Sequence, residues 1–221
     1  MSRMLADRLN YQYLDTGAMY RAAGLAIWRT GIDIKNEKEV EEICQSLEIN
    51  FIHKGTKTKI YLGDEDVTSA IREPAIDMMA SNISTLNVVR KIMTRLQRKI
   101  GTKGPLVAEG RDMGTVVFPE AKQKFYLDAS LEVRVDRRFQ ERKKKGEPIS
   151  RKMVKEDLIK RDTQDMNRPL CPLRPAKDAK VIDTTHLNPQ QVANKIINEM
   201  KKESRHLFSI APKKSLTEKN K

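Results

Sequence analysis

The stretch Glu109–Pro119 reads EGRDMGTVVFP and directly follows a short apolar segment, residues 105–108. The apolar segment predicts a buried strand, and the glycines after it predict a turn. A parallel strand that ends in such a turn presents Arg111 and Asp112 at the carboxyl edge of a sheet, where open α/β sheets bind ligands. A guanidinium binds phosphate through two parallel hydrogen bonds, and a carboxylate accepts from an amine. This pair therefore predicts a ligand that carries both a phosphate and a base.

Outward from this stretch, strand and helix patterns alternate along the chain. Apolar runs bounded by turn residues predict strands at 11–14, 106–109, 124–128 and 180–183. Helical periodicity predicts the last turns of a helix before residue 10 and further helices at 18–28, 37–47, 75–84, 88–100, 131–144, 150–164 and 189–203. Asp15 or Thr16 is expected to cap the helix at 18–28, which Gly31 ends. Asn87 is expected to cap the helix at 88–100. Residues 48–73 indicate a small β insertion, and the remaining alternation predicts an α/β fold with a parallel sheet covered on both faces.

The composition fits a cytoplasmic protein with one sizeable core. Of the 221 residues 38% are hydrophobic, and the mean hydropathy is -0.62. No apolar run approaches the roughly 20 residues of a membrane helix, and the first residues lack the apolar core of a signal peptide. Cys44 and Cys171 lie far apart without metal-ligand spacing, which favours two free thiols in a reducing compartment.

The net charge of +13 is concentrated in one segment. Residues 134–161 hold 12 Lys and Arg against 5 Asp and Glu. This segment has two interpretations. It could bind anions, either nucleotide phosphates or nucleic acid. It could also be a solvated helix face rich in lysine, and this interpretation fits residues 143–145 best. The chain contains only five Tyr and five Phe, so it offers little of the aromatic interleaving that single-strand nucleic-acid binding favours.

Several arginines and acids are placed where they could meet at the sheet edge. Arg21 follows the turn at 15–17, and Ser81 and Arg90 flank the break between two predicted helices. One helix face would carry Arg161, Asp165 and Arg168, and another Arg134, Arg137 and Arg138. Taken singly, Arg21 is better explained as a solvated surface charge, and Ser81 and Arg90 as a helix cap and a surface charge. The first triplet is open to two interpretations, an ion-pair ladder along the helix or a polar stripe that closes over a nucleotide. The second triplet favours a ligand more strongly, because three like charges on one face repel each other unless an anion lies between them.

The order of these motifs resembles bacterial cytidylate kinases, the CMP/dCMP kinases of the nucleoside monophosphate kinase family. The resemblance runs from residue 1 to about residue 203. It rests on LDTGAMYRAAGLA (14–26), DVTSAIR (66–72), AEGRDMGTVVFP (108–119), FYLDAS (125–130), RRFQERKKKGE (137–147) and KRDTQDMNRPLCPL (160–173).

The resemblance implies a role for each candidate residue. Thr16 and Arg21 would lie in the acceptor-nucleotide site, with Arg21 and Arg111 on the phosphate of CMP. Ser81, Arg90 and Asp112 would read cytosine, whose amine suits a carboxylate and whose ring nitrogen and carbonyl suit donors. Asp165 and Arg168 would contact the sugar, and Arg161 would lie near the transferring phosphate. Glu109 is a weaker candidate for a position near magnesium.

The resemblance also implies a division of the chain. The core would comprise residues 1–34, 101–130 and 169–203, with a nucleoside monophosphate-binding insertion at 35–100 and a helical lid at 131–168 that covers ATP. Residues 204–221 would form a basic, disordered tail. Lid arginines, Arg137 first and then Arg134 and Arg138, would act with Arg161 to neutralise charge in the reaction ATP + (d)CMP → ADP + (d)CDP. The expected partners are these nucleotides, with Mg²⁺ bound to ATP, and the expected state is a monomer without nucleic-acid or membrane partners.

One family feature is missing: no G-x-x-x-x-G-K-[ST] loop, which cradles the phosphates of ATP, occurs in the 221 residues. The family's first strand, central in the sheet, would precede that loop, and its loss would leave two exposed strand edges and an unfilled core. We expect an N-terminally truncated, poorly active polypeptide. The alternatives are a CMP-binding pseudoenzyme and, less favoured, a basic nucleic-acid-binding protein.

Overall fold

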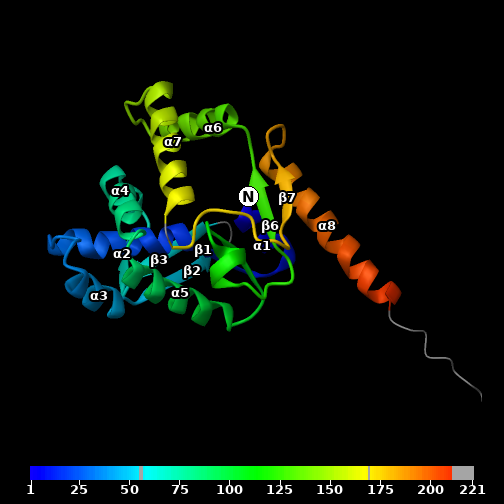
Figure 1. Cartoon of the computed structure of the whole chain (residues 1–221), viewed down its shortest axis with the longest axis horizontal. Coiled ribbons are helices and arrows are strands. Elements are labelled where there is room, and N and C mark those ends of the chain that lie inside the picture. The colour runs from blue at the N-terminus through cyan, green and yellow to red at the C-terminus, as the bar shows by residue number, and fades with distance from the viewer. Residues whose placement is uncertain (55–56, 169, 211–221) are drawn as a thin grey trace, which may run out of the picture.

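A computed structural model describes residues 1–54, 57–168 and 170–210 (Figure 1). The helices are α1 (Ser2–Leu9), α2 (Thr16–Thr30), α3 (Glu37–Gln45), α4 (Pro74–Ile83), α5 (Asn87–Gly101), α6 (Leu131–Lys144), α7 (Arg151–Asn167) and α8 (Pro189–Ile210). The strands are β1 (Gln12–Asp15), β2 (Ile49–Lys54), β3 (Lys57–Leu62), β4 (Glu65–Asp66), β5 (Leu106–Glu109), β6 (Phe125–Asp128) and β7 (Lys180–Asp183). Within the described helices, none is both long enough and apolar enough to cross a bilayer.

The four strands of the α/β part pair in parallel, as the sequence predicts, but in two separate pairs. β1 pairs with β5 in the register Leu14↔Ala108, and β6 pairs with β7 in the register Leu127↔Ile182. Within the described chain β5 and β6 share no ladder. The parallel strands therefore form two separate two-stranded sheets.

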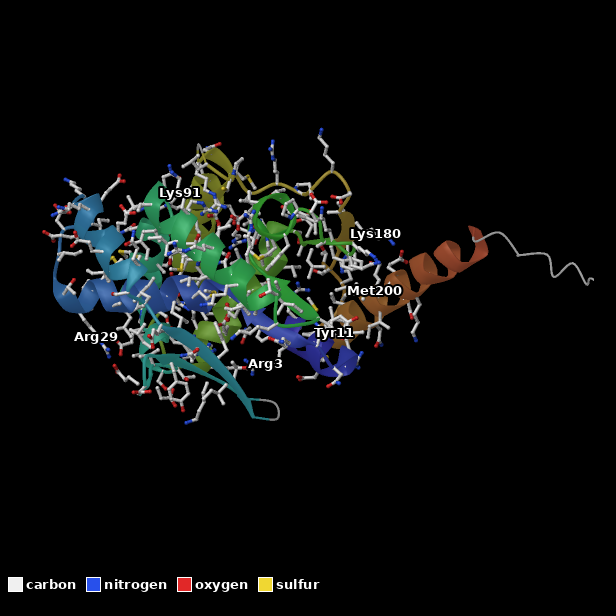
Figure 2. The ribbon with its side chains drawn as sticks, turned by 90° about the horizontal axis from the view of Figure 1, so that it is seen from below. Arg3, Tyr11, Arg29, Lys91, Lys180 and Met200 are labelled. Carbon is white, nitrogen blue, oxygen red and sulfur yellow. The ribbon has the colours of Figure 1, made fainter. Side chains whose placement is uncertain are left out.

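A cavity of about 1050 Å³ lies between β5 and β6. Its walls come from both strands and from apolar side chains of α1 and α8. Figure 2 labels two of the residues that line it, Tyr11 after α1 and Met200 on α8. The space between the two strand pairs is thus open.

Helix α2 organises one half of the molecule, because it is apolar on two faces. One face joins Met19, Ala23 and Ile27 to α3 and α5 in a buried cluster. The opposite face packs Ala18, Ala22 and Leu25 against the antiparallel sheet and α4. Gly24 allows the approach of α4, since a Cβ there would lie 3.1 Å from the backbone nitrogen of Ala80. This packing fixes the start of α2 relative to α4.

The predicted β insertion is an antiparallel sheet in the order β2-β3-β4. Its outer strand is joined to α2 by Arg29, labelled in Figure 2, which donates two hydrogen bonds to Glu65 at 2.6 and 2.7 Å. The insertion therefore packs against the same helix that begins at the sheet edge. Whether residues 35–100 move as a separate domain stays a prediction.

Helices α6 and α7 form a hairpin at the edge of the molecule (Figure 1). Ion pairs within the hairpin join Arg142 to Glu147 and Asp157 at 2.6 and 3.1 Å. Arg151 pairs with Glu132 and Asp136 at 2.5 and 2.7 Å. Much of the positive charge of residues 134–161 is thus balanced locally.

Three local features differ from the sequence predictions. Asn87 is the first residue of α5 rather than its cap, since Leu86 occupies the cap position with no side-chain hydrogen bond. Residues Met113–Val117 form a π-helical turn, which the double-glycine pattern does not reveal. Helix α8 continues to Ile210, so the predicted tail at 204–221 begins inside a helix. Residues 211–221 of that tail lie outside the described residues.

Candidate functional site

A pocket of about 380 Å³ lies where the ends of β1 and β5 meet α4, α5 and α7. This volume lies in the range of small-molecule sites. All eight residues predicted to bind the substrate line it: Thr16, Arg21, Ser81, Arg90, Arg111, Asp112, Asp165 and Arg168. Glu109 and Arg161 line it as well. The structure thus brings together residues that are widely separated in the sequence.

The floor of the pocket is built by the turns after β1 and β5. Asp15 caps α2, because its Oδ1 accepts from the backbone N–H of Ala18 at 2.8 Å. Thr16, the other predicted cap, instead donates its hydroxyl to the carbonyl oxygen of Glu109 at 2.7 Å. Gly110 makes this contact possible, since a Cβ there would lie 2.4 Å from Thr16 Oγ1. The two strand ends are therefore locked together at the site.

At one end of the pocket Arg90 and Asp112 form a buried ion pair, Nη2 to Oδ2. Their side chains are only 6% and 8% exposed. Arg90 Nη1 also donates to the carbonyl oxygen of Ser84 at 3.1 Å. Burial disfavours the charge on Arg90, but the surrounding negative groups, Asp112 among them, outweigh it and raise the pKa of the guanidinium. The guanidinium of Arg90 therefore stays charged, and its two contacts fix its orientation.

Asp165 joins two arginines across the pocket. Its Oδ1 accepts from Arg168 Nη1 at 3.3 Å, and its Oδ2 lies 3.2 Å from Arg111 Nε. Arg168 follows the last residue of α7 and donates Nε to the carbonyl oxygen of Cys171 at 2.6 Å. Burial lowers the pKa of Arg168, and the positive charge of Arg90 lowers it further.

The other end of the pocket carries a second group of positive charges. Arg21 lies 3.5 Å from Asp15 and 3.8 Å from Asp77, and both are long contacts. Arg161 has no ion pair among the described residues. Loss of solvation lowers the pKa of Arg161, and the nearby Arg111 lowers it further. The mutual repulsion of Arg161 and Arg111 favours a bound anion beside them.

Several buried polar atoms of the pocket accept or donate no hydrogen bond within the described part of the chain. They are Arg21 Nε, Arg90 Nε, Arg168 Nη2 and Asp165 Oδ2. A buried polar group without a partner costs about 1–3 kcal/mol, and native proteins leave few of them. Asp165 Oδ2 still has its ion pair with Arg111, but the three donors in the same pocket indicate a polar ligand that accepts from them.

Comparison with known proteins agrees with this geometry. The sequence profile of the family described as cytidylate kinase matches residues 1–202. The chain belongs to the cytidylate kinase family. It is 43% identical over 197 residues to a cytidylate kinase from Syntrophotalea carbinolica, a match that covers 89% of this chain and 84% of the relative. A cytidylate kinase from Thermotoga maritima is 38% identical over 198 residues, covering 89% and 88% respectively.

The arginines of α6 do not enter the cytidylate kinase pocket. Arg137, the strongest catalytic candidate from the sequence, donates to the carbonyl oxygens of Thr184 and Leu187 at 2.6 and 3.0 Å. Arg134 pairs with Asp162 of α7 and lines the cavity between the strand pairs. Arg138 pairs with Asp77 and Glu141, each at 3.0 Å. Each of the three guanidiniums thus has its own partners within the protein. Their spacing on one helix face therefore does not require a shared anionic ligand.

Glu109, the candidate for a position near magnesium, has a partner in the protein. Its carboxylate accepts from the hydroxyl of Tyr13 at 2.5 Å, and burial raises the pKa of that hydroxyl further above its usual value. Within the described residues no group of three or more His, Cys, Asp or Glu side chains could hold a metal. The residues present therefore do not form a metal site of their own.

Tyr20 and Asp77 are among the pocket-lining residues that sequence reasoning missed. Tyr20 lies one helical turn after Thr16, and Asp77 lies one turn before Ser81. Residues four positions apart share a helix face, so this spacing from two predicted site residues was a signal in the sequence. Burial raises the pKa of Tyr20 to about 12. Its hydroxyl therefore remains protonated and can donate at neutral pH.

Proposed function

We propose that the pocket binds the acceptor nucleotide of a kinase reaction in which ATP phosphorylates CMP and dCMP. The buried donors without hydrogen-bond partners carry this proposal, because their chemistry matches a cytidine monophosphate. Membership in the cytidylate kinase family supports the same reaction.

The buried end of the pocket suits the cytosine base. Asp112 uses Oδ2 for Arg90, and we assign its Oδ1 to the exocyclic amine of cytosine. Arg90 Nε and Arg168 Nη2 are buried donors without partners, which suit the ring nitrogen and carbonyl. We assign Ser81 to the same edge as an adaptable hydroxyl. Uracil would place a carbonyl against Asp112 and an N–H against a guanidinium, and is therefore disfavoured.

The open end suits the phosphate and sugar. Arg21 and Arg111 would hold the phosphate, with Arg161 beside the oxygen that attacks ATP. Asp165 and Thr16 lie between the two ends and would fix the sugar and the floor. Phosphoryl transfer requires alignment and positive charge more than covalent chemistry. Holding the acceptor phosphate in one orientation is thus the main contribution of these residues.

On the side of the phosphoryl donor, we assign roles to fewer residues. ATP is the phosphoryl donor of this family, and Mg²⁺ would arrive bound to ATP, so no step is assigned to the ion or to a residue holding it. The predicted lid at 131–168 corresponds to the α6–α7 hairpin. Since Arg137 is held by the loop after β7, we assign charge neutralisation near the acceptor to Arg161 instead. We also propose a cytoplasmic location, consistent with two free cysteines.

Calorimetric titration of the 221-residue chain with CMP, dCMP, UMP and AMP tests the proposal. We expect CMP and dCMP to bind, and UMP and AMP to bind at least about tenfold more weakly, as a site with buried polar groups requires. In the Asp112→Asn variant the preference for CMP over UMP should shrink. Equal binding of all four nucleotides, or no binding of CMP, would refute the assignment.

A further inference from the structure

Asp77 is a carboxylate of the pocket to which the binding of cytidine assigns no role. Asp77 lies on α4, one turn before Ser81. Its Oδ2 accepts from Arg138 Nη2 of α6 at 3.0 Å, and its Oδ1 lies 3.8 Å from Arg21 Nη1 of α2. A single carboxylate therefore bridges a pocket arginine and an arginine of the hairpin.

The two contacts of Asp77 differ in strength. The contact with Arg138 has the length of a hydrogen bond, whereas the contact with Arg21 is a long ion pair. Arg21 has a second long contact with Asp15 at 3.5 Å, and its buried Nε has no partner within the described residues. Arg21 is thus held loosely by two carboxylates and can be taken over by a better anion.

The bridge also has a defined place between two parts of the molecule. Among the ion pairs of the described residues, Arg138–Asp77 is the one that joins α6 to the half built around α2. Other α6 arginines pair within the hairpin or donate to the loops before α6 and after β7. The side chains of Arg138 and Asp77 are 33% and 30% exposed, so the pair is only partly screened by solvent.

We propose that Asp77 is a positioning residue that couples the phosphate of the acceptor nucleotide to the docking of α6. In the empty pocket its carboxylate balances Arg21 in place of the phosphate. When the phosphate binds Arg21, it displaces and repels the carboxylate, which then pairs with Arg138 alone and holds α6 against α4. This inference rests on the proposed function, since it assumes that the pocket takes a nucleoside monophosphate.

The test compares Asp77→Asn with a matched control, Asp157→Asn. Asp157 also pairs with a hairpin arginine, Arg142 at 3.1 Å, but it does not line the acceptor pocket. CMP and cytidine are titrated by calorimetry, and hydrogen exchange of the α6 amides is measured with each. In the wild-type chain CMP should protect α6 more than cytidine does.

In Asp77→Asn we expect two changes. The ratio of the cytidine Kd to the CMP Kd should rise roughly twofold to fivefold, because a competing charge has been removed from a partly exposed pocket. The extra protection of α6 by CMP should disappear. Asp157→Asn should match the wild type in both measurements. Arg138→Gln, which leaves Asp77 in place, should lose the extra protection without a rise in the ratio.

Each contrary result has a distinct meaning. An unchanged or lower Kd ratio in Asp77→Asn overturns the competition with phosphate. Undiminished protection of α6 by CMP, in Asp77→Asn or in Arg138→Gln, overturns the coupling. If the wild-type chain binds neither CMP nor cytidine, the proposed function fails and this inference fails with it. If CMP and cytidine both bind, and the variants show the same Kd ratio and the same α6 protection as the wild-type chain, the proposed function stands and the role of Asp77 is refuted.

Discussion

The arginines of the acceptor pocket and the arginines of α6 look alike in sequence but differ in their surroundings. In the pocket, buried nitrogen atoms of Arg21, Arg90 and Arg168 have no hydrogen-bond partner within the described chain. On α6, the guanidinium of Arg137 donates to backbone carbonyl oxygens, and Arg134 and Arg138 pair with carboxylates.

The difference shows what identifies a ligand site among many positive charges. A cluster of arginines can be neutralised by the protein itself, as it is in the hairpin. Donors that are buried and left without partners cost free energy unless something else binds them. The pocket therefore depends on a ligand in a way that the α6 arginines do not.

The largest expected effect comes from removing the buried partner of a pocket arginine. Asp112→Ala leaves the guanidinium of Arg90 buried and uncompensated, and should lower the free energy of unfolding by about 3 kcal/mol. Asp162→Ala removes the partner of the more exposed Arg134 and should cost about 1 kcal/mol or less. Urea unfolding of the two variants measures both values. Equal losses would remove the distinction between the two regions.

A substitution on the pocket floor should come next. Gly110→Ala forces a Cβ against Thr16 Oγ1 and Met113, which should cost about 2 kcal/mol of stability and weaken CMP binding. The matched change Gly146→Ala lies between α6 and α7, where a Cβ meets no atom within 4 Å but φ is +76°. It should cost about 1 kcal/mol through backbone strain and leave CMP affinity unchanged. Thermal unfolding and calorimetry on both variants check this, and a CMP affinity of Gly110→Ala equal to wild type would contradict it.

Arginine deletions compare the two regions directly. Arg111→Ala should weaken CMP binding at least about tenfold, because a charged hydrogen bond to the phosphate is lost, and should leave cytidine binding nearly unchanged. Arg137→Ala should leave CMP affinity within about twofold, since its donors go to carbonyl oxygens of the protein. Calorimetric Kd values decide. A loss of CMP affinity in Arg137→Ala as large as in Arg111→Ala would contradict this and show that Arg137 contributes to CMP binding.

The smallest effect concerns pH and the core beside the pocket. Burial raises the pKa of Cys44 from 9.0 to about 11. The folded state therefore keeps this proton longer than the unfolded state, so the contribution is complete below pH 9.0 and is lost as the pH rises toward 11. At pH 9.0 the loss is only about 0.4 kcal/mol. Urea unfolding at pH 7 and pH 9 should detect this difference in the wild type, and a matching decline in Cys44→Ala would exclude the thiol as its cause.

Much of the fold was predictable from sequence, because apolar periodicity and turn residues are local signals. The limits of β5, β7 and α6 agree with the predicted segments, and Gly31 ends α2 in the left-handed conformation, with φ 70°. The division into two strand pairs was not predictable from these local signals, because strand pairing depends on contacts between distant segments. The π-helical turn at Met113–Val117 was not predictable, because it depends on how this loop packs.

The candidate site was predictable as a set, but not in its pairings. The resemblance to cytidylate kinases named eight residues as substrate-binding, and all eight line one pocket. Nothing in the sequence distinguishes Arg137, which is bound to Thr184 and Leu187, from Arg161, which lines the pocket. Asp77 was missed because its two partners come from helices far away along the chain.

An experimental structure of the chain with CMP would test the central claim most directly. The account predicts that the phosphate contacts Arg21 and Arg111. It also predicts that the cytosine edge lies against Asp112, with the free nitrogen atoms of Arg90 and Arg168 donating to the nucleotide. CMP bound elsewhere, or these nitrogen atoms still without a nucleotide acceptor, would contradict it.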